Sequence, residues 1–323
     1  MKIRIPLQSL LAGVLIAALA ACAPGPAASG DGPNAAAVGA GPAASGQSWG
    51  RMLDWPTAAA SIMQQGGDAP LLNQSGQRPA PIASAAKIIT ALTLLAEHPI
   101  GPGEPGPSID LDSSDVKRYE AYRQIDGSVL PVYSGMRLTL REALAAMLLP
   151  SANNIADTLA VWAFGSLAKY RAVAQQRVTE LKLGSTTVGL DASGFDPSTT
   201  STAHDLALLA SAAMDSPVIA DLVARTSFDI EGYGPVQNTN SLLGSNGVIG
   251  LKTGTSNQAR GVFLFAAKAT VDGRPTVLVG AVQGAGERAQ DAIEQARKLL
   301  GSIRDGSAPD QPAMAQTGPA VRR

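Results

Sequence analysis

The sequence predicts an α/β protein of the α+β type, in which an antiparallel sheet with flanking helices faces an all-helical lobe. Strand-like runs lie near both ends of the chain and a helical section lies between them, so strands from the two ends can pair in one sheet. The hydrophobic fraction of 45% is sufficient for a well-buried core. No internal repeat divides the chain, and we expect one folded domain over residues 49–303.

Two short strands and a helix begin this domain. Residues 58–63 favour a strand, and Leu71-Leu72 favour a second one after the Gly66-Gly67 turn. Ser84 is then expected to begin a helix that stops near His98-Pro99. The apolar residues of this helix are Ile88, Ile89, Leu92 and Leu95.

The helical section starts with a capped helix. Thr139 or its neighbour is expected to cap a helix over residues 141–149, which Pro150 ends. Ser151 is expected to start the next helix, which runs to about residue 164. Two further helices are predicted, over residues 167–181 and 204–214.

The last part of the domain is expected to return to the sheet. Strand-like runs cover residues 248–255, 262–270 and 275–283. Asp272-Gly273 between the last two runs is typical of a tight hairpin turn. A closing amphipathic helix is predicted over residues 288–303.

Both termini lack the pattern of a folded domain. Residues 1–21 have a basic start and a short apolar run, which favours a secretory signal, and the Leu-Ala-Ala run before Cys22 resembles a bacterial lipoprotein signal. Residues 22–48 are rich in Ala, Gly, Pro and Ser, so we expect a flexible tether, and we expect a disordered tail over residues 304–323. We therefore expect an exported protein, lipid-anchored through Cys22 at the outer face of the cell membrane or in the periplasm.

Composition excludes several kinds of protein. A net charge of -1 offers no broad basic surface, so nucleic acid is not an expected partner. One cysteine and two histidines are too few for a typical zinc site or an internal disulfide. No metal or cofactor is expected.

Three short motifs carry the chemistry. They are Ser84-Ala85-Ala86-Lys87, Ser151-Ala152-Asn153 and Lys252-Thr253-Gly254-Thr255. Ser-x-x-Lys also occurs at Ser114 and at Ser166, but only the copy at Ser84 begins an apolar helix and precedes the other two motifs. These residues supply a nucleophile, a base and a second hydroxyl. Lys87 has an ordinary pKa near 10.4, so it can act as a base only if burial and a neighbouring cation, for which Lys252 is the candidate, lower its pKa.

The motif order, with gaps of roughly sixty and one hundred residues, resembles the penicillin-binding D-alanyl-D-alanine carboxypeptidases, over about residues 50–303. The resemblance implies the fold of serine β-lactamases and penicillin-binding proteins, with an acyl-enzyme on Ser84. It implies peptidoglycan stem peptides as substrate, loss of the terminal D-alanine, and inhibition by β-lactams. The implied catalytic residues are Ser84, Lys87 and Ser151, and the implied substrate-binding residues are Asn153, Lys252, Thr253, Gly254 and Thr255. The backbone N–H groups of Ser84 and Thr255 are the implied oxyanion donors.

The motifs are compatible with further functions. A class A β-lactamase shares the motif order, but it carries Glu-x-x-Leu-Asn, and the nearest string here, at residues 180–184, lacks the asparagine. A DD-endopeptidase, an esterase and a non-catalytic wall-binding lipoprotein also fit these residues. Arg260 is close enough in sequence to assist carboxylate binding, although a solvated arginine at a strand start is the simpler interpretation.

Overall fold

The structure is a computed structural model that describes residues 53–73 and 77–305 of the 323-residue chain. These residues belong to one compact unit, Gly46–Arg323. The predicted signal segment, Cys22 and tether lie outside the described residues, as does the predicted tail from residue 306 onward.

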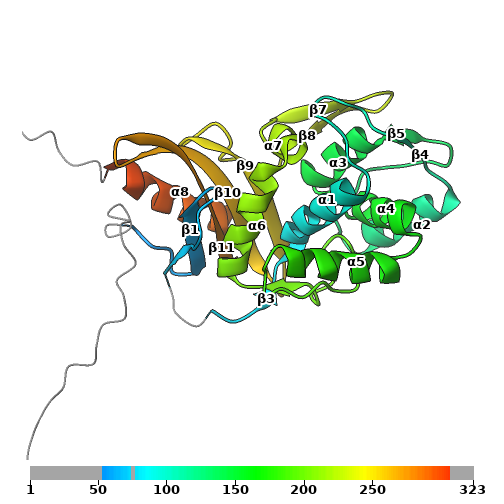
Figure 1. The fold of residues 1–323 in the computed structure, drawn as a ribbon. Coiled ribbons are helices and arrows are strands. Elements are labelled where there is room, and N and C mark those ends of the chain that lie inside the picture. Colours follow the sequence, from blue (N-terminus) through cyan, green and yellow to red (C-terminus); the bar gives the residue numbers. More distant parts are fainter. Residues whose placement is uncertain (1–52, 74–76, 306–323) are drawn as a thin grey trace, which may run out of the picture. The chain divides into compact units, whose positions relative to one another are not determined.

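The main sheet has five antiparallel strands in the order β2-β1-β11-β10-β9 (Figure 1). The bounds are β1 Ala59–Gln64, β2 Leu71–Leu72, β9 Val248–Ser256, β10 Arg260–Val271 and β11 Arg274–Ala285. Strands from the start of the chain therefore pair with strands from its end, which confirms the predicted sheet. The strand that carries the Lys-Thr-Gly motif, β9, lies at the edge of this sheet.

Helices cover both faces of the sheet. Helix α8 (Ala289–Asp305) packs on β10 and β11, whereas α6 (Ala203–Asp215) packs on β1 and β11 from the opposite side (Figure 1). The layer under α8 buries Phe263, Phe265 and Leu299 completely. Each such side chain contributes about 1.5–3 kcal/mol of hydrophobic free energy, so this layer holds β9 through its neighbour β10.

The helical lobe surrounds one buried helix. Helix α1 (Ala86–Glu97) contacts α3, α4, α5 and α6, and all of its residues from 86 to 94 are buried. The other helices are α2 Ser113–Gln124, α3 Leu140–Leu148, α4 Asn153–Phe164, α5 Leu167–Glu180 and α7 Pro217–Val223. Because α1 starts directly after a 3-10 turn, Ala83–Ala85, that packs on β9, the core helix of the lobe begins at the sheet edge.

Two predicted local signals are confirmed. The β10–β11 hairpin turns at Asp272 and Gly273, both of which have positive φ, as the tight turn requires. Thr139 caps α3, and its capping box with Glu142 satisfies donors at the helix start.

Several short elements have no counterpart in the prediction. They are the pairs β3 Ala80–Pro81 with β6 Thr200–Ser201, β4 Ser108–Asp110 with β5 Arg137–Thr139, and β7 Ser227–Ile230 with β8 Gly234–Gln237, together with α2 and α7. Helix α8 also extends to Asp305, two residues beyond its predicted end.

No single helix within the described ranges is both long and apolar enough to cross a membrane. Helices α6 and α7 meet that criterion only as a pair, and they are bent by 101° where they join.

Candidate active site

The predicted nucleophile lies in a tightly packed turn. Ser84 is partly exposed, whereas its neighbours Ala83 and Ala85 are buried, so the turn presents one side chain outward. Ala83 has a φ of 45°, and a Cβ placed on Gly194 would lie 2.0 Å from the Ala83 carbonyl oxygen. Gly194 itself has a φ of +74°, so only glycine suits this close approach. The loop around Gly194 therefore supports the turn that holds Ser84.

Lys87 lies one helical turn after the serine and is fully buried. Its Nζ is 2.8 Å from Ser84 Oγ, 2.7 Å from Asn153 Oδ1 and 3.0 Å from the Ser193 carbonyl oxygen. A neutral amine has two N–H groups and one lone pair. With both N–H groups donated to Asn153 and Ser193, the lone pair is left to accept the proton of Ser84.

Burial favours that neutral form. It lowers the pKa of Lys87 from 10.5 to about 7, against the opposing negative charges of Asp191 and Asp157. The expected help from Lys252 is not a leading cause of this shift. The repulsion between the two lysines instead lowers the pKa of Lys252, which burial already depresses well below its ordinary value.

The Ser-x-Asn motif crosses from a loop into α4. Ser151 is not the start of the helix, as the sequence predicted: α4 begins at Asn153, and the N-cap is Ala152. Ser151 instead has a φ of 69° directly after Pro150. Its hydroxyl is buried and has no hydrogen-bond partner among the described residues. Asn153 is buried as well, and its amide oxygen holds Lys87.

The Lys-Thr-Gly strand runs beside the nucleophile turn. A Cβ placed on Gly254 would lie 3.1 Å from the Ile82 carbonyl oxygen and 3.2 Å from the Ser84 amide nitrogen. The small residue at this position therefore lets the β9 backbone approach the Ser84 backbone closely. Lys252 is buried behind it, where its Nζ donates to the Thr253 carbonyl oxygen at 3.0 Å.

The two threonine hydroxyls of this strand contact different parts of the protein. Thr253 Oγ1 is 2.6 Å from Thr239 Oγ1, and the Thr239 amide donates to the carbonyl of Leu149, two residues before Ser151. Thr239 thus links the Lys-Thr-Gly strand to the Ser-x-Asn loop. Thr255 Oγ1 accepts a hydrogen bond from the amide of Ala289 at the start of α8, at 2.7 Å.

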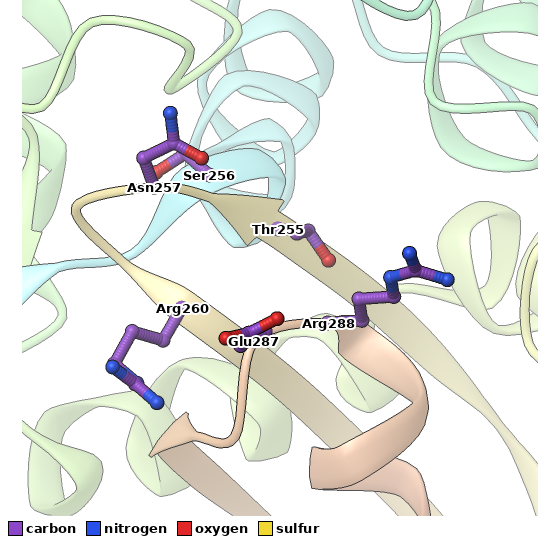
Figure 2. A pocket seen from close by; sticks show the side chains of 6 residues that line it. All are labelled: Thr255, Ser256, Asn257, Arg260, Glu287 and Arg288. Carbon is purple, nitrogen blue, oxygen red and sulfur yellow. The ribbon is translucent and has the colours of Figure 1, made fainter.

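A cavity of about 480 Å³ adjoins Thr255. It is lined by Thr255, Ser256, Asn257, Arg260, Glu287 and Arg288. Figure 2 shows the Arg288 side chain extending beside Thr255, whereas the Arg260 side chain points away from it. Arg288 is a candidate site residue that sequence reasoning missed, because it follows Thr255 by 33 positions and belongs to no motif.

A second cavity, of about 720 Å³, also adjoins the end of β9. Tyr122 and Phe195 contribute its aromatic wall, and their rings meet edge to face with centroids 5.7 Å apart. The two cavities share Thr255, Ser256 and Asn257, so both open beside the strand that carries the motif.

The carboxylate considered for a β-lactamase lies elsewhere. Glu180 ends α5, where its side chain pairs with Arg177, and it lines a separate cavity with Thr93 and Glu97. In the parts of the chain that the structure describes, no group of histidine, cysteine, aspartate and glutamate residues could hold a metal ion.

A partly exposed serine beside a buried lysine with a pKa lowered to about 7 is the arrangement typical of serine acyl-transfer enzymes in which lysine replaces histidine as the base. A family model described as D-alanyl-D-alanine carboxypeptidase matches residues 53–282. The chain belongs to the D-alanyl-D-alanine carboxypeptidase family.

Individual relatives agree with this assignment. The chain is 35% identical over 194 residues to the D-alanyl-D-alanine carboxypeptidase DacB2 of Mycobacterium tuberculosis, an alignment that covers 58% of this chain and only 62% of that protein. It is 28% identical over 233 residues to a D-alanyl-D-alanine carboxypeptidase of Streptomyces sp. strain K15, with 66% and 77% of the two chains covered.

Solved structures share the fold. The Streptomyces K15 DD-transpeptidase superposes with a TM-score of 0.67 at 23% identity and covers 77% of this chain and 98% of its own. A D-alanyl-D-alanine carboxypeptidase of Mycobacterium tuberculosis H37Rv superposes with a TM-score of 0.65 at 27% identity and covers 78% and 92%. The predicted fold class is thereby confirmed.

Proposed function

We propose that this protein is a serine D-alanyl-D-alanine carboxypeptidase, which removes the terminal D-alanine of peptidoglycan stem pentapeptides through an acyl-enzyme on Ser84. The observation that carries the proposal is the 2.8 Å contact between Ser84 Oγ and Lys87 Nζ, in a buried setting that lowers the lysine pKa to about 7. A lysine that is half neutral near pH 7 is suited to general-base catalysis there.

Acylation begins when neutral Lys87 accepts the proton of Ser84. The serine oxygen then attacks the carbonyl carbon of the penultimate D-alanine, and the backbone N–H groups of Ser84 and Thr255 stabilise the resulting oxyanion. The C–N bond to the terminal D-alanine breaks, and the proton held by Lys87 passes to the departing amine through the Ser151 hydroxyl. Water then cleaves the ester, which regenerates Ser84 and its proton.

Recognition of a free C-terminus is assigned to the Lys-Thr-Gly strand and its neighbour Arg288. Lys252 and the Thr253 hydroxyl lie on β9, and the Arg288 side chain extends beside the end of that strand. A substrate carboxylate supplies the negative charge that favours the protonated form of Lys252, so binding is expected to take up a proton. Charge-assisted hydrogen bonds of this kind discriminate a carboxylate from an amide.

The direct test is mass spectrometry of a stem pentapeptide incubated with the protein, with and without penicillin. Loss of one D-alanine, blocked by penicillin and absent in Ser84→Ala, is the expected result. Added glycine tests transfer to an amine, because one relative is described as a transpeptidase. Release of no D-alanine by a folded wild-type protein would contradict the proposal.

Persistence of the penicillin adduct separates this function from that of a β-lactamase. Glu180 pairs with Arg177 and lines a separate cavity, and the proposed machinery contains no second base dedicated to deacylation. A fluorescent penicillin should therefore acylate Ser84 and remain bound for minutes. Release within seconds would favour the β-lactamase.

We also propose that the chain is exported and carries lipid on Cys22. The support is the sequence of residues 1–22, with its basic start, short apolar run and single cysteine. Metabolic labelling with an alkyne fatty acid should mark the wild-type protein and not Cys22→Ser. Equal labelling of both proteins would remove the support for this anchor.

A further inference from the structure

A buried carboxylate near Lys87 is not used by the mechanism above. Asp157 lies on α4, one helical turn after Asn153, and only 5% of its surface is exposed. One of its oxygens accepts the Ala192 amide at 2.9 Å, and the other accepts the Tyr122 hydroxyl at 2.7 Å. Asp157 thus joins α2 and α4 to the start of the loop that supports the nucleophile turn.

The same loop holds Lys87. The Ser193 carbonyl, one residue after Ala192, accepts the lysine hydrogen bond at 3.0 Å. Asp191 fastens the rest of the loop by accepting the amides of Gly194 and Asp196, at 2.7 and 2.8 Å. The two carboxylates therefore differ: Asp191 accepts hydrogen bonds from amides of its own loop, whereas Asp157 accepts one from the Ala192 amide of that loop while lying on helix α4.

We propose that Asp157 is a positioning residue that acts on Lys87 in two ways, by clamping the loop whose carbonyl holds the lysine and by placing a negative charge near its amine. The inference deepens the proposed function and rests on it. It concerns the pH range in which Ser84 is acylated, which the motifs alone do not determine.

Charge counting gives the direction of the effect. The titratable groups that interact with Lys87 are Asp157 on α4, Asp191 on the loop and Lys252 on β9, and the two carboxylates interact in turn with Tyr122 on α2 and Tyr170 on α5. Burial raises the pKa of both tyrosines above their ordinary value, so both stay neutral, and it raises the pKa of Asp157 to about 6. Above pH 6, ionised Asp157 therefore favours the ammonium form of Lys87, which is the inactive form.

Asp157→Asn removes the charge and keeps the shape. The asparagine oxygen can still accept the Ala192 amide, and its NH₂ group can donate to the Tyr122 oxygen. Lys87 should then lose its proton at lower pH. The acidic limb of the acylation profile should move down by about one pH unit, which corresponds to a tenfold change in the ratio of neutral to charged Lys87. Acylation at pH 6 should be about threefold to tenfold faster than in the wild type, with equal rates near pH 9.

Tyr122→Phe is the matched control. It removes the hydrogen bond to Asp157, which helps to keep the pKa of that carboxylate down, and it leaves both carboxylates in place, so it should lower the rate at all pH values and move the limb much less than Asp157→Asn does. The pair of variants separates the charge of Asp157 from its clamp. If Asp157 only held the structure together, both variants would be acylated more slowly than the wild type, and neither pH profile would shift.

The experiment measures the rate of Ser84 acylation by a fluorescent penicillin from pH 5 to 10 in the wild type and both variants, after thermal melts show that each is folded. An acidic limb that stays in place in Asp157→Asn overturns the inference. If that variant does not fold, Asp157→Ser, whose hydroxyl can accept the Ala192 amide, is used with the same expected shift. Absence of any wild-type adduct would instead count against the proposed function itself.

Discussion

The two buried lysines differ in how many hydrogen-bond partners the protein provides for their amines. Lys87 has three partners from three parts of the chain: Ser84, Asn153 and Ser193. Lys252, equally buried, donates within the described structure only to the carbonyl of its neighbour Thr253. The group assigned to move a proton is therefore fixed by the protein, whereas the group assigned to bind charge keeps donors for a ligand. Preorganisation is therefore concentrated at the lysine to which the proposed function assigns proton transfer.

Replacement of Lys87 should have the largest effect on the rate of Ser84 acylation. Lys87→Met keeps the length of the side chain and removes the base, so acylation of Ser84 by penicillin should fall by about a thousandfold, within the range expected for general-base catalysis. Stopped-flow or gel fluorescence measures the rate, and circular dichroism checks the fold. A rate within tenfold of the wild type would show that another group takes the proton.

Replacement of the second lysine should act on recognition. Lys252→Met is expected to lower kcat/KM for a peptide with a free C-terminal carboxylate by about 10- to 100-fold, the value of one or two charge-assisted hydrogen bonds. The same peptide with an amidated C-terminus serves as the control, because its weak cleavage should barely change. Equal losses for both peptides would place Lys252 with Lys87, in the proton pathway.

The two arginines of the smaller cavity provide a finer comparison. Arg288→Gln should raise KM for the carboxylate peptide by about tenfold, because its side chain extends beside Thr255 (Figure 2). Arg260→Gln should leave KM within about twofold, as expected for a solvated arginine at a strand start. Added salt should weaken the Arg288 effect. Equal effects of the two changes would refute this assignment.

Protein stability should show the smallest effect. Lys87 keeps its proton up to about pH 10.5 in the unfolded chain but only up to about pH 7 when folded. Between these values the unfolded state holds more protons, so the stability of the wild type relative to Lys87→Met should rise with pH. Thermal melts at pH 7 and pH 10 should show a relative gain of a few degrees. A flat difference would mean that Lys87 stays charged in the fold.

The sequence predicted the elements whose apolar residues recur with the period of a helix or strand, and those that match a known motif. The β10–β11 hairpin followed from Asp272-Gly273, and the α3 cap followed from Thr139. Helix α2 was missed because most of its side chains are polar or charged and only Asp115 is buried, so no apolar period marks it. A capping box at Asp112 was the one signal that could have revealed it.

Contacts between distant segments could not be predicted in the same way. Arg288 approaches Thr255 only because α8 starts beside the end of β9, and Asp157 meets the Lys87 loop only through the packing of α4. The conformation of Ser151 was also beyond the motif, since its positive φ depends on how the chain turns after Pro150. The three motifs identified the candidate site residues, and the packing determined which neighbours contact them.

The position of β1 beside β11 has a consequence for synthesis of the chain. The serine turn precedes β9, β10 and β11, the strands at its side and next to β1, by more than 160 residues, so these strands leave the ribosome much later than the turn. Until they arrive, Lys87 lacks the complete enclosure that depresses its pKa, and Ser84 stays an ordinary alcohol. A nascent or truncated polypeptide should therefore be chemically silent, and reactivity should begin only once the final hairpin has closed.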